Sequence, residues 1–374
     1  MNIDIREVKN RKDLEIFIFL PEKIHKDHRT WVPPIYADEW KYFDPKKNRA
    51  FNHCDAVMLL ASQDGREVGR IMGIINYRYN EIREEKTARF SYLETWRDKA
   101  VVRALLGHVE EWARSKGMER IIGPFGFTDQ DPEGFMVEGF ENRATIASYC
   151  NFEWMPEMVE DLGYSKDVEY LVYKLDVPKE IPEFYKRIYE RVKKKGNFEV
   201  LDFKKKRELK PLIKPVLHLM NECYIESNIY GYTPLDEREM EELAKRYLPV
   251  LDPRFVKCVK RDGRLVAFIV GIPDMTEGIQ KAKGRLFPLG FIRILRAARQ
   301  AKQLDLLLGA VKDKYRGLGL DVLMGVRMLM SAREAGMEVI DTHHELEQNV
   351  KVRAEMEKMG GKVYKRFRVY QKNL

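Results

Sequence analysis

The residues best suited to chemistry lie between positions 304 and 323, in the stretch LDLLLGAVKDKYRGLGLDVL. An apolar segment typical of a strand, 306–311, runs into Tyr315-Arg316-Gly317-Leu318-Gly319 and then into a segment typical of a helix. Glycines let the backbone turn tightly and approach a ligand closely, and the unpaired amides that open a helix attract phosphate. Because Arg316 adds positive charge beside them, the stretch predicts a pyrophosphate site.

Two other phosphate-binding motifs do not fit this stretch. The dinucleotide fingerprint G-x-G-x-x-G would require glycine where the chain has Val322, and the P-loop would require a terminal Lys-Ser/Thr pair that is missing. An ordinary helix entry without a ligand stays open as the alternative.

A second group of reactive side chains lies in 341–349, DTHHELEQN, after another segment typical of a strand. His343 is a candidate base because histidine titrates near neutrality, and Glu347 and Asn349 add polar groups. Tyr370, at the end of the last strand, is a candidate proton donor. The alternatives are surface or capping roles, and a packed aromatic for Tyr370. Adjacent histidines on a strand point to opposite faces, so no metal site is predicted.

The bulk composition bounds the class of protein. A chain of 374 residues exceeds one typical core. Its 44% hydrophobic and 34% charged residues are ordinary for a globular protein. There is no apolar run of about 18 residues, and the charged N-terminus does not resemble a signal peptide. Four cysteines without a C-x-x-C pair indicate a reducing compartment, so we expect a cytoplasmic protein. The net charge of +8 indicates an anionic partner.

The chain also repeats itself. Apolar segments flank Asp64-Gly65 and Asp262-Gly263, and Asp-Gly supplies the positive φ angles of a tight hairpin. ARSKGMERI in the first copy matches AREAGMEVI in the second, and segments near both ends of each copy match in the same order. Each copy reads as strand, helix, hairpin, strand, long helix, strand, helix and final strand.

This repeat predicts the domain organisation. The long helices are expected at 98–116 and 319–335. We expect an α/β fold of two tandem domains, 1–178 and 196–374, each a mixed central sheet flanked by helices. A helical linker is expected at 179–195.

The motifs resemble those of a known superfamily. The pattern V-x-x-x-Y-R-G-x-G between a hairpin and a long helix resembles the acyl-carrier motif of the GNAT superfamily, and Glu347-x-Asn349 followed by Met359-Gly360-Gly361 resembles another of its segments. Over almost the whole chain the sequence resembles the YghO-like family, which includes bacterial ceramide synthases. That resemblance rests on WVPP at 31–34, DPKKN at 44–48, GPF at 123–125, GFMVEGF at 134–140, GRLFPLG at 284–290 and RGLGLD at 316–321.

The resemblance implies an acyl-CoA-dependent N-acyltransferase with the GNAT fold. It implies direct transfer from acetyl-CoA or acyl-CoA, as co-substrate, to an amine, with a long-chain amino lipid as the family-based acceptor. Catalytic candidates are Glu347, Asn349, His343 and Tyr370. Coenzyme A is expected at Gly309, Val311, Tyr315, Arg316, Gly317, Leu318, Gly319 and Leu320, with a bulged strand amide near 309–311 holding the thioester carbonyl.

The chain departs from these patterns at three places. Asp321 breaks the superfamily's carrier pattern but fits the family, Met356 stands where a general-acid tyrosine is frequent, and His343-His344 replaces a Ser-Trp-like pair. Two alternatives therefore stay open: a degenerate GNAT-fold binding or regulatory module, and an acetyltransferase of a small-molecule or protein amine. Nucleic-acid binding is not expected, because no motif accompanies the charge.

Three further segments qualify the site. The first copy has 93–98 in place of the glycine turn, without glycine and ending in acids, so we expect no coenzyme A site in 1–178. The loop 123–142 either lines a substrate pocket or packs structurally against the second copy. The segment 281–302 alternates apolar and basic residues, which predicts either a helix covering the sheet or peripheral contact with an anionic membrane at its inner face.

Overall fold

The computed structural model describes residues 3–145, 148–195 and 197–374. The first half of the chain contains β1 (Ile3–Glu7), α1 (Arg11–Ile24), α2 (Tyr36–Tyr42), β2 (Cys54–Gln63), β3 (Arg66–Asn76), α3 (Tyr77–Arg83), β4 (Thr87–Thr95), α4 (Lys99–Ser115), β5 (Arg120–Gly123), β6 (Phe135–Glu138), α5 (Trp154–Glu160) and β7 (Ser165–Asp176). A short 3-10 helix, η1 (Arg49–Asn52), precedes β2.

The second half contains α6 (Glu183–Lys195), β8 (Phe198–Asp202), α7 (Lys206–Glu226), α8 (Glu237–Tyr247), β9 (Val256–Arg261), β10 (Arg264–Pro273), α9 (Thr276–Lys281), α10 (Gly290–Gln300), β11 (Gln303–Val311), α11 (Leu320–Glu334), β12 (Val339–Asp341), β13 (Glu345–Leu346), α12 (Val350–Lys358) and β14 (Lys362–Asn373). The 3-10 helices η2 (Pro253–Phe255) and η3 (Asp313–Tyr315) precede β9 and α11.

The local signals in the sequence form the elements that they predicted. Asp64-Gly65 and Asp262-Gly263 have positive φ and close two-residue hairpins, with Gln63 paired to Arg66 and Arg261 paired to Arg264. The long helices α4 and α11 lie within one residue of their expected bounds at each end. The linker helix is α6, which packs on α11.

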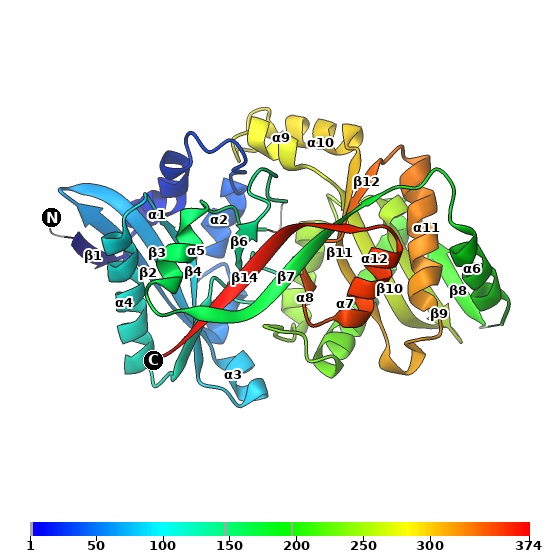
Figure 1. Cartoon of the computed structure of the whole chain (residues 1–374), viewed down its shortest axis with the longest axis horizontal. Coiled ribbons are helices and arrows are strands. Elements are labelled where there is room, and N and C mark those ends of the chain that lie inside the picture. The colour runs from blue at the N-terminus through cyan, green and yellow to red at the C-terminus, as the bar shows by residue number, and fades with distance from the viewer. Residues whose placement is uncertain (1–2, 146–147, 196) are drawn as a thin grey trace.

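One mixed sheet runs through both halves of the molecule (Figure 1). Its strand order is β1-β2-β3-β4-β5-β14-β7-β12-β11-β10-β9-β8, with β13 on β7 and β6 on β14. The pairs β4–β5 and β11–β12 are parallel, whereas the hairpins are antiparallel. The expected α/β fold with mixed sheets and flanking helices is therefore confirmed.

The two final strands cross between the halves, which the repeat did not predict. In Figure 1, β14 (red) and β7 (green) run side by side across the middle of the molecule. β14, from the second half of the sequence, lies between β5 and β7, and β7 continues to β12. Both strands have 12 residues, long enough to join the two parts of the sheet. The division into domains at 179–195 stays a prediction from the repeat, and in the structure β7 and β14 interlock the two halves.

Helices cover opposite faces of the sheet in the second half. Val259 and Val266 pack with α6 and α11, whereas their neighbour Cys258 packs with α7 and α8. Successive residues of a strand face opposite sides, so α11 and α7 lie on different faces of β9–β11.

Candidate active site

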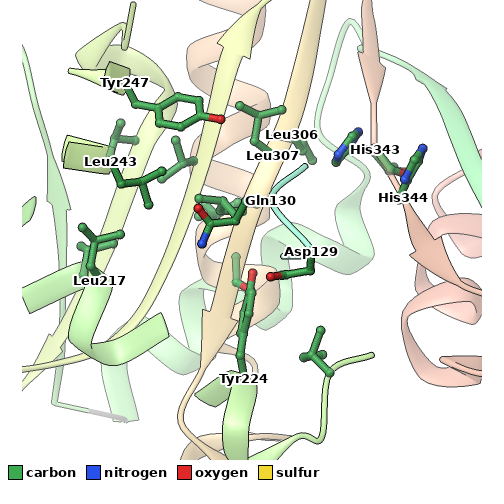
Figure 2. Close-up of a pocket in the computed structure, with 18 of the residues that line it drawn as sticks. Asp129, Gln130, Leu217, Tyr224, Leu243, Tyr247, Leu306, Leu307, His343 and His344 are labelled. Carbon is green, nitrogen blue, oxygen red and sulfur yellow. The ribbon is translucent and has the colours of Figure 1, made fainter. Parts of the chain in front are cut away.

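A cavity of about 440 Å³ lies between the halves, on the α7–α8 side of the sheet. Its size falls in the range of small-molecule sites, about 300–1,000 Å³. Figure 2 shows Leu217, Leu243 and Tyr247 on one side, His343 and His344 on the other, and Asp129 between them. Leucine, isoleucine and valine side chains from α7, α8, β10 and β11 form most of the wall: Leu209, Leu212, Ile213, Val216, Leu217, Leu243, Leu248, Leu251, Ile269, Val270, Leu306, Leu307 and Leu308.

The cavity reaches the sheet where two parallel strands separate. β11 and β12 pair only from Gln303–Asp305 to Val339–Asp341. Beyond that point the chain leaves β11, and Glu345 pairs with Leu171 on β7 instead. The resulting gap exposes one edge of β11 to the cavity, whose lining includes residues 306–309 and 342–346.

A β-bulge sits on this exposed edge of β11. Leu308 pairs with Val270 and Leu306 pairs with Gly271, so Leu307 is an extra residue on β11. The extra residue in a bulge is left out of the ladder, which frees backbone polar groups for a ligand. The bulge was expected near 309–311, and the structure places it at Leu307 instead. The position differs because it depends on the pairing register between β10 and β11, which the sequence of one strand does not determine.

The glycine turn follows directly from β11 and opens α11 without a side-chain cap. Gly317 and Gly319 have positive φ, and Gly319 is the N-cap residue. Arg316 is exposed, donates from Nε to the Val311 carbonyl at 3.2 Å and from Nη2 to the Ser227 hydroxyl. The first amides of α11 are thus available to an anion, which fits a pyrophosphate group.

The other residues expected to hold coenzyme A have different placements. Leu320 is buried in the core beneath the helix start, and Leu318 is half-exposed on the turn. Tyr315 packs edge-on against Phe198. Gly309 borders the cavity, and its carbonyl accepts a hydrogen bond of 3.5 Å from Tyr224. The β11 edge therefore borders the cavity, whereas the turn that follows β11 is not part of its lining.

The matching positions of the first half are filled by protein groups. The Asp98 carboxylate accepts from the amides of Ala100 and Val101 at the start of α4. In β4, the amide of Tyr92 donates to the Tyr149 hydroxyl at 2.9 Å, where the register also shifts. An anion at this helix start would meet the Asp98 carboxylate.

Four carboxyl groups border the cavity: Asp129, Asp131, Glu133 and Glu345. Burial raises the pKa of Asp129 to about 7 and the pKa of Glu345 to about 8. Burial, together with the neighbouring Asp129, raises the pKa of Glu133 well above its ordinary value. Asp129 and Glu133 come from the loop between β5 and β6, so this first-half loop lines the pocket.

His343 and His344 both border the cavity, but their pKa values differ from the expectation. Burial lowers the pKa of His343 to about 4 and the pKa of His344 well below its usual range. His343 has a positive φ and its amide donates to Asp341. Both rings are therefore neutral near pH 7, and the expectation that His343 titrates near neutrality is wrong because the sequence did not show its burial.

Two of the catalytic candidates lie outside the cavity. Glu347 pairs with Lys166 at 2.8 Å on the surface, and this hydrogen bond lowers its pKa. Tyr370 is fully buried in the core of the first half, where its hydroxyl donates to Glu160. Asn349 borders the cavity and precedes α12. The structure thus brings His343 and Asn349 together, but neither Glu347 nor Tyr370.

Sequence reasoning missed Tyr224 on α7. Its hydroxyl lies at the cavity, and in Figure 2 the Asp129 carboxylate points toward it. Burial, followed by the Asp129 charge, raises the pKa of Tyr224, so the hydroxyl stays protonated. Met356, at the expected tyrosine position, also borders the cavity. No motif marked Tyr224, because α7 reads only as an amphipathic helix.

Within residues 3–145, 148–195 and 197–374, no cluster of three histidine, cysteine or carboxylate side chains is arranged to hold a metal ion. The described helices also include none with the length and apolarity needed to cross a bilayer.

No protein-family model matches the chain. It is 27% identical over 381 residues to the bacterial ceramide synthase of Caulobacter vibrioides, covering 100% of this chain and 98% of that protein. It is 24% identical over 377 residues to Protein YghO of Escherichia coli, covering 99% and 95%.

Solved structures give the fold. A tandem GNAT protein from the clavulanic acid biosynthesis pathway aligns over 100% of this chain and 98% of its own, with a TM-score of 0.55 and 12% identity. The chain has the tandem GNAT fold. A GCN5-related N-acetyltransferase from Sphaerobacter thermophilus agrees, with a TM-score of 0.53, 12% identity and coverage of 99% and 95%.

The resemblance to tandem GNAT proteins of the YghO-like family is therefore confirmed along the whole chain. The open helix start and the bulged strand belong to the second half, whereas the cavity lies between the halves and includes the acidic loop of the first half.

Proposed function

We propose that this tandem GNAT protein is an N-acyltransferase that moves an acyl group from a coenzyme A thioester to an amine. The observation that carries the proposal is the bulge at Leu307 on a β11 edge that borders the cavity, together with the uncapped α11 start that follows β11 along the chain. In this proposal the α11 start binds phosphate, the bulged strand holds the thioester carbonyl, and the cavity accepts the hydrocarbon chain. The relative named a bacterial ceramide synthase supports the same chemistry.

The α11 start and Arg316 hold the donor. Amides at a helix start donate to pyrophosphate oxygens, and Arg316 adds charge at the same turn. The exposed edge of β11 then holds the pantetheine arm, and the free amide at Leu307 donates to the thioester oxygen. Such a donor stabilises the negative charge that develops on this oxygen in the tetrahedral state.

Glu345 is the proton acceptor in this proposal. An alkyl ammonium titrates near pH 10, like lysine, so it must lose a proton before nitrogen can attack. Glu345 takes that proton, and the neutral amine forms the C–N bond as the carbonyl electrons move to oxygen. When the C–S bond breaks, the thiolate takes the second nitrogen proton, relayed by the Tyr224 hydroxyl.

The cavity wall indicates the acceptor class. Most of its lining is aliphatic, whereas carboxyl and imidazole groups gather at the β11 end. A molecule with one amino group and a long hydrocarbon chain matches this division. An amino lipid is therefore the proposed acceptor.

The experiment that tests the function is incubation of the purified chain with palmitoyl-CoA, acetyl-CoA and a long-chain amine, with amide product measured by mass spectrometry. We expect amide from palmitoyl-CoA. Arg316→Glu is expected to weaken acyl-CoA binding by about tenfold in calorimetry, because it reverses the charge beside a phosphate. Unchanged affinity would show that the carrier site is misplaced, and absence of product from every thioester would contradict the enzyme assignment.

We also propose that the segment 281–302 touches an anionic membrane, at the cytoplasmic face. Its apolar side chains are uncovered: Phe287 is 80% exposed, and Leu289, Phe291, Ile292 and Leu295 are about half-exposed. Arg293 and Arg296 flank them on α10, beside a cleft that also holds Arg143 and Lys174. Exposed apolar groups beside cations are typical of interfacial helices, and the acceptor would come from that membrane.

The membrane contact predicts a specific binding loss. Phe287→Ser with Ile292→Ser is expected to weaken sedimentation with phosphatidylglycerol vesicles by about tenfold or more, because two apolar side chains no longer enter the lipid. Val350→Ser, an exposed apolar position on α12, is the matched control. If both variants bind vesicles equally well, the membrane contact is wrong and α10 only covers the sheet.

A further inference from the structure

We propose that Asp129 and Glu133, on the first-half loop, bind the positively charged amino group of the acceptor. The inference rests on the proposed function and adds which half of the molecule selects the acceptor. The loop, residues 124–134, joins β5 to β6 and enters the cavity between the halves, opposite the aliphatic wall from the second half (Figure 2).

The loop is held firmly by groups other than these two carboxylates. Arg89 is buried and donates to the carbonyls of Gly126 at 3.0 Å and Phe127 at 2.9 Å. Asp131 accepts from the amides of Phe127 and Thr128 and from a tyrosine hydroxyl. These bonds fix the loop from within, so Asp129 and Glu133 are not needed to fold it.

Asp129 lies two residues away yet has an uncompensated oxygen. Its side chain borders the cavity, and its Oδ1 atom is covered without a hydrogen-bond partner among the described residues. Asp131 Oδ2, in contrast, has three donors, two of which are amides of the loop.

Glu133 also has one oxygen without a partner, although the Tyr170 hydroxyl donates to its carboxyl group. Its exposed fraction is 7%, and its Oε2 atom has no partner among the described residues. Its Oε1 lies 3.8 Å from Nδ1 of His344, a ring that is neutral near pH 7. The nearby cation is Arg89, whose guanidinium donors go to backbone carbonyls instead.

A buried carboxylate with an oxygen that has no donor is costly unless it is protonated or a cation arrives. Two of them at one end of an aliphatic cavity therefore favour a ligand with positive charge at one end and a chain at the other. An ammonium group has three N–H donors, enough to reach both carboxylates. This placement would also bring its nitrogen to the end of the cavity that Glu345 borders.

This arrangement gives the first half a role in the reaction. Its own carrier position is closed by Asp98, whereas its loop completes the acceptor site of the other half. Acceptors without a positive charge, such as long-chain alcohols, would leave both carboxyl groups unpaired and be disfavoured.

The test compares Asp129→Asn and Glu133→Gln with Glu141→Gln, an exposed residue beyond β6, in the full chain. Calorimetry with dodecylamine and dodecanol measures binding without turnover. We expect each cavity variant to bind dodecylamine about tenfold more weakly, because a hydrogen bond to a charged group is lost. Dodecanol affinity and the melting temperature are expected to stay as in the wild type, because the loop keeps its internal bonds.

The possible failures are distinguishable. If both cavity variants bind dodecylamine as tightly as Glu141→Gln does, the inference is wrong, whether or not the chain is an enzyme. If they lose dodecylamine binding but no thioester yields amide in the wild type, the amine site stands and the transferase assignment fails.

Discussion

Glu345→Gln is expected to lower kcat for amine acylation by about 10²–10⁴-fold, the usual contribution of a positioned proton acceptor. Its carboxylate makes no hydrogen bond or ion pair with the residues that the structure describes, and it borders the cavity beside the separated strands. Glutamine keeps the size and removes the basic oxygen. Acyl-CoA affinity is expected to stay unchanged in calorimetry, because the α11 start is not altered.

Glu347→Gln is the matched control for this prediction. Glu347 is two residues away, pairs with Lys166 on the surface and does not border the cavity. We expect its kcat to stay within about twofold of wild type, because an exposed ion pair contributes little. If the two variants lose activity equally, Glu345 is not the base.

The same assignment predicts how activity depends on pH. Burial raises the pKa of Glu345 to about 8 and of Asp129 to about 7. Both groups act as carboxylates in the proposal. The value of kcat/KM is therefore expected to be low at pH 6, where both groups are protonated, and to rise as they lose their protons up to about pH 8. His343, with a pKa near 4, stays neutral across this range, and Tyr224 stays protonated. In the Glu345→Gln variant, the part of the kcat/KM increase that is centred near pH 8 is expected to be absent.

Short-range signals predicted the elements well. The Asp-Gly hairpins and the helix start at Gly319 are each set by the backbone preference of a few neighbouring residues. The repeat then gave two similar halves in the correct order. These features need no knowledge of distant contacts, which is why one sequence was enough.

The site itself depends on contacts that local patterns do not contain. Asp129 reaches the cavity only because its loop crosses to the other half, and Tyr370 leaves it because β14 joins the first-half sheet. The neutral state of His343 follows from burial. Glu345 and Glu347 look alike in the sequence, and only the departure of the chain from β11 separates an enclosed carboxylate from a surface ion pair.

The carrier turn gives the second large effect. Gly319→Val is expected to weaken acyl-CoA binding by about 100-fold, or about 2.7 kcal/mol, the size of losing one strong hydrogen bond to a charged group. Gly319 has φ of +84°, and an added Cβ would lie 2.8 Å from Cγ2 of Val192 on α6. The start of α11 must therefore shift, and its amides no longer converge on the pyrophosphate. Calorimetry with coenzyme A measures the loss.

Gly317→Ala separates this effect from backbone strain alone. Gly317 has φ of +74°, but an added Cβ meets no atom within 4 Å, so only a strain of about 1–2 kcal/mol is expected.

Adding Val192→Ala to Gly319→Val removes the side chain that blocks the new Cβ and is expected to restore part of the affinity, since contacting residues are energetically coupled. Full coenzyme A affinity in folded Gly319→Val would instead place the carrier site away from α11, and the bulge at Leu307 would then lose its role beside it.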